Sequence, residues 1–238
     1  MNGLLAGWWQ TYTSEPVVFS LGLTGRVCLY ALLLQAGVGI LLAWYLSSRD
    51  SLCRGLVESL VSFPLIFPPI ASGYLLLVLL GRMSPAGSFV EKYLGVEIVF
   101  SFPGIVIAAF VAGLPLVVKP IQSAILSLGN ELTEASYTLG RGKFATFFRI
   151  TLPCVKKSVI SGLVLGLGRS LGEVGITLMV GGNIIGKTNT LSLEVFNAVY
   201  DGDFERATAL CLLLFCFSLV LFSVIKKLDR QGTGRISF

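Results

Sequence analysis

The chain has 238 residues, of which 54% are hydrophobic and only 13% are charged, and its mean hydropathy is +0.83. Soluble domains carry roughly twice that share of charge, about 25%. The composition therefore excludes an ordinary soluble domain and indicates an integral membrane protein. The net charge of +5 is not gathered into a basic stripe with interleaved aromatic residues, so we expect no nucleic-acid partner.

The chain contains no His, which removes the commonest metal ligand and general base. Its cysteines show no paired spacing, so we predict free thiols and no metal site. No nucleophile accompanies a base, and we therefore predict a subunit without catalytic residues and without a cofactor of its own. The first basic residue is Arg26, so no positively charged segment marks a cleavable signal peptide. The cysteines are Cys28, Cys53, Cys154, Cys211 and Cys216.

Apolar blocks recur along the chain and predict an all-α integral membrane protein with about five transmembrane helices. Before them, residues 1–16 form a short segment whose Trp8, Trp9 and Tyr12 favour the membrane–water interface. After them, residues 227–238 form a basic tail. The blocks are residues 17–46, 56–80, 99–126, 159–182 and 204–225.

Prolines divide two of these blocks. Pro68 and Pro69 lie in the second block, shortly before Ser72, so the helix there must be kinked or broken. Irregular backbone at membrane depth is tolerated only where protein or a water-filled path satisfies it. A packing kink and a part of such a path both fit. The third block is interrupted by Pro103, Pro115 and Pro120.

Lys and Arg residues between the blocks predict the orientation, because cytoplasmic loops carry an excess of them. If residues 130–153 lie inside, the outer side carries Arg82 and Lys92, in a polar loop at 81–98, together with Lys187. We therefore predict an outer N-terminus and a cytoplasmic C-terminus. The inner side then carries Arg49, Arg54, Arg141, Lys143, Arg149, Lys156, Lys157, Lys226, Lys227, Arg230 and Arg235.

The fourth block holds two charges within an apolar segment. Arg169 and Glu173 are four residues apart and would share one face of a helix. Charges inside a membrane normally pair or face a cavity, and the neighbouring glycines allow another helix to approach closely. A gate or pathway element and a structural ion pair both fit this pattern.

Residues 130–153 form the one long polar run between apolar blocks, and helix signals pass through it. Asn130 is a suitable N-cap, Glu131 and Glu134 favour the first turns, and Gly140 can end the helix, as can Gly142. A second short helix at about 143–149 would carry its three phenylalanines on roughly one face, and Pro153 closes the segment. We predict a folded loop that a partner in the water phase grips. The phenylalanines are Phe144, Phe147 and Phe148.

Several residues of this run keep a characteristic spacing: Glu134, Ala135, Ser136 and Gly140, then Ile150, Leu152 and Pro153. The pattern resembles the EAA loop of permease subunits of binding-protein-dependent ABC importers. One position departs, because the family usually has Ala where this chain has Ser136. The resemblance implies a coupling helix that docks in a cleft of a separate cytoplasmic ATPase.

Further stretches narrow the resemblance. The run from Arg169 to Glu173, followed by Gly175, is similar to the molybdate and sulfate branch of these permeases. Residues 67–77, which include Pro68, Pro69 and Ser72, and residues 100–118 resemble the second and third spans of molybdate permeases. The resemblance therefore covers about residues 20–226, nearly the whole chain.

The resemblance implies a type I ABC importer permease fold over residues 17–226, in a multi-pass protein of the inner (plasma) membrane. The implied partners are membrane lipid, a second copy of this subunit, a cytoplasmic ATPase dimer that holds ATP and Mg, and an extracytoplasmic molybdate-binding protein. The expected function is ATP-driven import of molybdate or tungstate by alternating access. Pathway candidates are Pro68, Pro69, Ser72, Arg169 and Glu173.

Other functions stay open. A sulfate or thiosulfate permease is the first alternative, because molybdate and sulfate are both tetrahedral dianions. The missing His argues against an intramembrane enzyme, and the well-formed loop argues against a non-transporting subunit. Residues 181–188 match the phosphate-loop pattern G-x-x-x-x-G-K-[ST], but no buried strand precedes them and they lie outside, so we expect no nucleotide there. Lys187 in this loop could still contact an anion or the binding protein.

Overall fold

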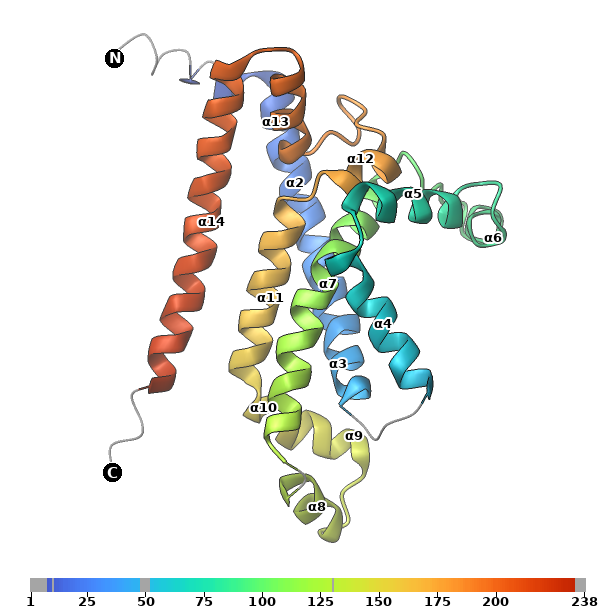
Figure 1. The fold of residues 1–238 in the computed structure, drawn as a ribbon, viewed down its shortest axis with the longest axis vertical. Helices are drawn as coiled ribbons and strands as arrows, with labels where there is room; N and C mark the ends of the chain where they lie inside the picture. Colours follow the sequence, from blue (N-terminus) through green and yellow to red (C-terminus); the bar gives the residue numbers. More distant parts are fainter. Residues whose placement is uncertain (1–7, 10, 48–51, 130, 234–238) are drawn as a thin grey trace.

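The computed structural model describes residues 8, 9, 11–47, 52–129 and 131–233, and in these ranges every regular element is a helix (Figure 1). Asn130, the predicted N-cap, and Arg49 lie outside the described residues. The elements are α2 (Glu15–Leu34), η1 (Gln35–Gly39), α3 (Ile40–Leu46), α4 (Leu52–Ile66), α5 (Pro69–Leu80), α6 (Pro85–Leu94), α7 (Phe102–Ser127), α8 (Glu131–Thr138), α9 (Lys143–Thr146), η2 (Phe147–Thr151), α10 (Leu152–Cys154), α11 (Lys156–Leu171), α12 (Gly175–Gly181), α13 (Leu191–Tyr200) and α14 (Phe204–Thr233).

Helix α7 is the centre of the bundle. It packs against α2, α3, α4, α11 and α12, and 61% of its most apolar stretch is buried within the chain. Helix α14 lies at the edge of the bundle, beside α11 and α13, and only 11% of its apolar stretch is buried (Figure 1). An apolar helix that the chain leaves uncovered needs lipid or another subunit around it.

The predicted multi-pass membrane protein is confirmed in outline. Among the residues that the structure describes, three helices are long and apolar enough to cross a membrane: Glu15–Leu46, Phe102–Ser127 and Phe204–Lys227. The number rises to five if two strongly bent helix pairs each count as one span. These pairs are Pro69–Leu80 with Pro85–Leu94, bent by 58°, and Lys143–Cys154 with Lys156–Leu171, bent by 77°.

The structure tests the predicted course of the helices in the second, third and fourth blocks. The second block is broken at Phe67 and Pro68, as its prolines predicted. The fourth block was wrongly predicted as one helix, because α11 ends at Leu171 and the chain restarts as α12 at Gly175. The interruptions predicted within the third block are wrong at Pro115 and Pro120, because α7 continues through both. Proline is tolerated inside such a helix where neighbouring helices pack around it and satisfy the freed backbone groups.

The segment predicted as a polar loop at 81–98 contains the helix α6, which corrects the prediction. The Ser84 hydroxyl accepts the Gly87 amide at 2.8 Å and caps the first turn, where Pro85 fits without losing a hydrogen bond. Gly95 ends the helix with a φ of 65°. Cap, proline and glycine together turn a polar sequence of mixed composition into a helix.

The bundle has two distinct ends. Helices α8 to α10 form one end, and the described end of α14 runs toward it (Figure 1). The start of α2, helix α13 and the turn into α14 lie at the opposite end. The start of α2 therefore lies at the opposite end from helices α8 to α10, toward which the described end of α14 runs, as the charge distribution predicted. The side of the membrane that each end faces stays a prediction.

Candidate functional site

Helices α8 to α10, residues 131–154, form a hairpin that projects from one end of the bundle, here called the α8–α10 hairpin (Figure 1). Helix α8 ends as the sequence predicted. Gly140 has a φ of 76°, its amide donates to the Tyr137 carbonyl at 2.9 Å, and the Arg141 amide donates to the Ser136 carbonyl at 3.2 Å. These paired bonds are a Schellman motif, which needs a residue without a Cβ at the left-handed position.

A buried hydroxyl pair joins the two arms of the hairpin. Ser136 is only 2% exposed and Thr146 only 1%, and their hydroxyl oxygens are 2.9 Å apart. Thr146 also donates to the Gly142 carbonyl at 3.1 Å. The residue at which this chain departs from the family pattern therefore makes a specific contact inside the hairpin, and sequence reasoning missed Thr146 as its partner.

An aromatic stack attaches the hairpin to the bundle. Phe147 is fully buried and its ring stacks on that of Trp44 in α3, with centroids 4.7 Å apart. Phe144 meets the same indole edge-on at 5.1 Å but remains 67% exposed. Phe148 is 52% exposed, so of the three phenylalanines that were predicted to lie on roughly one face only Phe147 is buried. The rings of Phe147 and Phe148 still touch edge-on, with centroids 5.1 Å apart, although only Phe147 is buried.

The free surface of the hairpin is apolar to an unusual degree for a polar loop. Glu134 and Ala135 are exposed, and so are several large apolar side chains on both arms. Large exposed apolar patches on an ordered surface mark an interaction site. The exposed apolar side chains are Leu132, Tyr137, Leu139, Phe144 and Phe148.

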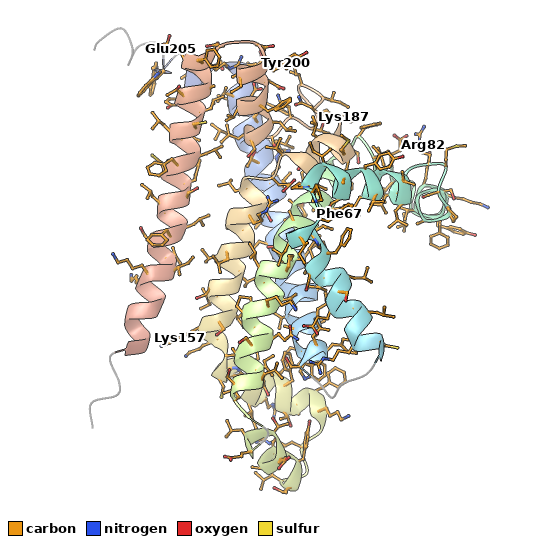
Figure 2. All side chains as sticks on the ribbon, viewed as in Figure 1. Phe67, Arg82, Lys157, Lys187, Tyr200 and Glu205 are labelled. Atoms are coloured by element: carbon orange, nitrogen blue, oxygen red, sulfur yellow. The ribbon has the colours of Figure 1, made fainter. Side chains whose placement is uncertain are left out.

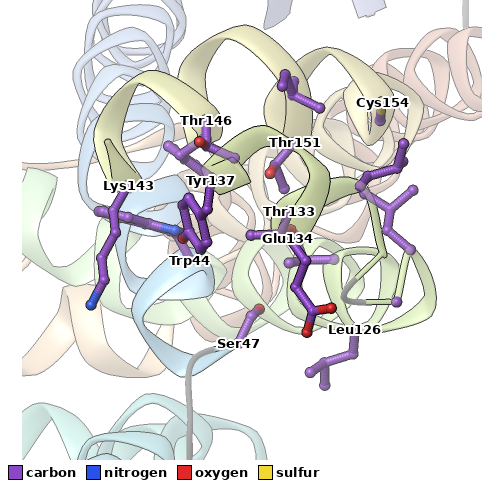
Figure 3. Close-up of a pocket in the computed structure, with 16 residues that line it drawn as sticks. Trp44, Ser47, Leu126, Thr133, Glu134, Tyr137, Lys143, Thr146, Thr151 and Cys154 are labelled. Atoms are coloured by element: carbon purple, nitrogen blue, oxygen red, sulfur yellow. The ribbon is translucent and has the colours of Figure 1, made fainter. Parts of the chain in front are cut away.

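A cavity of about 630 Å³ lies between the hairpin and the ends of α3 and α7. Glu134, Tyr137 and Ile150 line it from the hairpin, and Trp44 of α3 and Ser47, which follows α3, line it from the bundle. Figure 3 shows the Glu134 carboxyl on the side of the cavity where Ser47 lies. Glu134 is thus placed at the boundary between the hairpin and the spans, where a movement of one relative to the other would change its surroundings.

The last three motif residues form the turn from the hairpin into the bundle. Ile150 lines the cavity, Leu152 packs against the core beside α3 and α7, and Pro153 is exposed. Helix α10 ends one residue after Pro153, and the chain then bends by 77° into α11. The predicted role of Pro153 in closing the segment agrees with this bend.

The other predicted residues meet around the contact of α5 with α12. Pro69 starts α5, and a methyl group added at Gly175 would come within 2.8 Å of the Pro69 Cβ. One added at Gly73 would come within 2.9 Å of the Ile176 Cα. Ser72 is buried beside this contact. The two helices therefore touch backbone to backbone, directly after the breaks at Pro68 and at Glu173.

Arg169 and Glu173 form the predicted ion pair, with Arg169 Nη1 2.5 Å from Glu173 Oε2. They do not share one helix, because α11 ends at Leu171. The other carboxylate oxygen, Oε1, accepts the Ile176 amide at 2.7 Å and so caps α12. Glu173 is only 3% exposed, and its carboxylate joins the end of α11 to the start of α12. The geometry is that of a structural junction, and a role in gating stays a prediction.

Sequence reasoning missed a buried polar cluster at the contact of α7 with α11, here called the α7–α11 seam. Gln35 is fully buried in η1, and its Nε2 donates to the Ser170 hydroxyl at 3.0 Å. Ser170 donates to the Ala109 carbonyl at 2.7 Å. The seam is close-packed, because a methyl group at Gly113 would come within 2.5 Å of the Gly166 carbonyl oxygen. The sequence signal for this cluster was Gln35 itself, a polar residue within the first apolar block.

A second missed cluster connects α4 to α7. Lys119 Nζ lies 2.7 Å from Glu58 Oε1, and Gln122 donates to the same oxygen at 3.3 Å. Both charged side chains are a little over one-third exposed. Lys119 was visible in the sequence as a lone charge in an apolar block, but its partner lies 61 residues away.

The phosphate-loop pattern at 181–188 folds as a compact turn after α12. The Thr188 hydroxyl is buried and donates to the Gly181 carbonyl at 2.7 Å, while it accepts the Ile184 amide at 2.9 Å. A phosphate loop needs that hydroxyl free for Mg²⁺ and needs a strand before it. Helix α12 precedes this loop, so its geometry does not suit a nucleotide.

Comparisons with known proteins agree with this architecture. The molybdenum transport system permease protein ModB of Haemophilus influenzae is 34% identical over 226 residues, which cover 92% of this chain and 99% of that protein. The sulfate transport system permease protein CysT of Salmonella typhimurium is 29% identical, over 97% of this chain and 83% of that protein.

Solved structures have the same fold. A chain of a bacterial alginate ABC transporter, in complex with an alginate-pentasaccharide-bound periplasmic protein, matches with a TM-score of 0.73 at 19% identity, over 98% of this chain and 90% of that one. The model of the family described as binding-protein-dependent transport system inner membrane component matches residues 35–231. This chain therefore belongs to that family and is a multi-pass permease of the inner membrane.

Proposed function

We propose that this permease is the membrane subunit of an ATP-driven importer of molybdate, with tungstate as a second substrate of the same shape and charge. The observation that carries the substrate is the 34% identity to a molybdenum transport permease over nearly the whole chain, against 29% for a sulfate permease. The exposed apolar surface of the α8–α10 hairpin supports coupling to a separate ATPase, which would hold the ATP and Mg.

In this proposal the hairpin transmits movement. Closure of an ATPase dimer would displace α8, and the Phe147–Trp44 stack would carry the displacement into α3. Glu134 would hold the surface of the ATPase or the mouth of the cavity through its carboxylate, and Gly140 would keep α8 at its angle to α9. The hairpin moves as one unit because Ser136 and Thr146 join its arms.

A homodimer would complete the path. Much of the apolar surface of α4 is uncovered in this chain: Leu60 is 73% exposed and Ile66 is 89% exposed. A second copy would cover part of that surface, and an oxyanion released by an extracytoplasmic binding protein would pass between the copies. The candidate pathway elements are two places where helices end inside the bundle. One is the break near Pro68, Pro69 and Ser72, and the other is the junction of Arg169 with Glu173.

Sulfate or thiosulfate is the second candidate substrate class, because the sulfate permease also matches over nearly the whole chain. Molybdate and sulfate are tetrahedral dianions, and a permease that receives its substrate from a binding protein need not select between them itself.

Uptake of labelled molybdate into proteoliposomes tests the proposal. The vesicles would contain this chain, its ATPase and its binding protein, with sulfate or tungstate in excess as competitor. Uptake that resists sulfate but falls with tungstate is the expected result. Uptake that sulfate abolishes would move the assignment to the sulfate branch. Vesicles that keep the ATPase bound but take up neither anion would contradict both substrates.

A further inference from the structure

Helix α6 leaves the bundle sideways at the end opposite the α8–α10 hairpin (Figure 2). It is bent by 58° from α5, and a close contact fixes the bend, since Gly87 lies against the Gly81 carbonyl. Arg82 holds the other side of the turn through ion pairs with Glu91 on α6 and with Glu97 beyond it. Helix α6 is therefore held at a set angle and is not a loosely attached loop.

The two faces of α6 differ sharply. At about 100° per residue, Phe89 and Tyr93 each lie about 160° around the helix from Glu91. Their rings are stacked, with centroids 4.6 Å apart, and they are 60% and 66% exposed. Figure 2 shows Arg82, the partner of Glu91, on the side of α6 nearer to Tyr200 and Glu205. The aromatic face therefore points away from that end of the bundle, toward the depth at which the long apolar helices cross the membrane.

We propose that α6 is an interfacial anchor that buries the Phe89–Tyr93 face in lipid, at the membrane–water boundary on the end opposite the α8–α10 hairpin. Aromatic residues favour that boundary, and amphipathic helices lie in its plane with cationic side chains on their polar side. Lys92 fits this position, because its ammonium lies 5.7 Å from the Tyr93 ring centroid, at the border of the aromatic face.

Lipid suits this face better than a second protein does. The neighbouring helix α5 also exposes apolar side chains, since Leu75, Val78 and Leu79 are 48–57% exposed, so the same apolar solvent would cover both helices. A protein that covered Phe89 and Tyr93 would also cover the adjoining Lys92, which costs desolvation. In the lipid interface the Lys92 side chain reaches the headgroups and keeps its charge solvated.

Site-specific photocrosslinking in intact membranes tests this proposal. A photoreactive phenylalanine analogue would replace Phe89 or Tyr93, both exposed, so that the core is not altered. The matched control would carry it at Ser88, an exposed position nearer to Glu91 on the polar side of the same helix. We expect lipid adducts, identified by their mass, at 89 and 93 and several times fewer at 88. A crosslink from 89 or 93 to a second copy or to any other protein would overturn the proposal.

Quenching provides an independent measurement on different variants. Phe89→Trp would be compared with Ser88→Trp in a protein whose own tryptophans are replaced by phenylalanine. Lipids brominated near the headgroup should quench the tryptophan at 89 strongly, and aqueous iodide should quench it weakly. Stronger quenching by iodide than by the lipids would show that the face is in water and would overturn the proposal.

Discussion

The α8–α10 hairpin and the α7–α11 seam are organised in opposite ways. The hairpin is built from bonds between neighbours in sequence, such as the Schellman motif at Gly140 and the Ser136–Thr146 pair, and it leaves large apolar side chains exposed. The seam depends on residues far apart in sequence, because Gln35 and Ser170 are 135 positions apart, and almost nothing in it is exposed. One region exposes an apolar surface that a partner could cover, and the other is packed between helices of the same chain.

This difference separates two kinds of mutational effect. Changes in the hairpin should alter what the permease does with a partner while the spans stay folded, because the local bonds involve few other helices. Changes in the seam should destabilise the bundle itself, since interiors are close-packed and cannot absorb an added group. Substitutions of matched size in the two regions therefore test whether the division is real.

The largest effect is expected from Gly113→Ala in the seam. The added methyl group would meet the Gly166 carbonyl oxygen at 2.5 Å and the Ser170 hydroxyl at 2.7 Å, so α7 and α11 must separate. We expect a loss of about 3 kcal/mol in the free energy of unfolding. Denaturant unfolding of the purified protein in mild detergent measures it.

Gly168→Ala is the control for that experiment, because a methyl group there meets only Leu221, at an ordinary 3.7 Å. It should leave the free energy of unfolding unchanged or raise it slightly, since Ala favours a helix over Gly. Equal losses in the two variants would mean that the close contact at Gly113 does not carry the stability of the seam.

The hairpin could be predicted from the sequence because its signals are local. Glu134 in the first turns, Gly140 at the left-handed position and Pro153 before the next helix each act within a few residues. Hydropathy likewise predicted the spans, because the length of an apolar block indicates a membrane helix whatever the block packs against.

The seam and the junction could not be predicted in the same way. Gly172 directly follows Leu171, but glycine is also common inside membrane helices, and the break depends on the Glu173 carboxylate that caps α12. The burial of Gln35 depends on Ser170 and Ala109 in other helices. Helix α6 was missed for another reason: mixed polarity obscured an amphipathic helix in the segment at 81–98.

Glu173→Gln should have the next largest effect. The amide oxygen can still accept the Ile176 amide, but the charge that pairs with Arg169 is lost from a site only 3% exposed. We expect a loss of about 2 kcal/mol in the free energy of unfolding. Glu58→Gln is the control, since the pair of Glu58 with Lys119 is more than one-third exposed and should lose less than about 1 kcal/mol. The reverse order would mean that burial does not decide the strength of these pairs.

Gly140→Val should act on coupling more than on the fold. A β-branched residue at a φ of 76° costs about 1–2 kcal/mol locally and would open the end of α8. We expect the variant to remain monodisperse and to lose ATPase binding or ATP-driven uptake. Gly142→Val is the matched control, because Gly142 has a φ of −73° and open space at its Cβ. Normal uptake by the Gly140→Val variant would contradict the role proposed for α8.

The smallest effect is expected from Ser136→Ala, which restores the residue usual in the family pattern. The Ser136–Thr146 bond would be lost, but Thr146 keeps its bond to the Gly142 carbonyl, so no buried hydroxyl is left without a partner. We expect a loss of about 0.5–1 kcal/mol in the hairpin alone, seen as faster amide hydrogen exchange in α8 and α9 with the spans unchanged. Thr146→Val removes the same bond from the other arm, together with the bond to Gly142, and should accelerate exchange further. If exchange in α7 or α11 rose as well, the hairpin and the seam would not be independent units, and the comparison between them would fail.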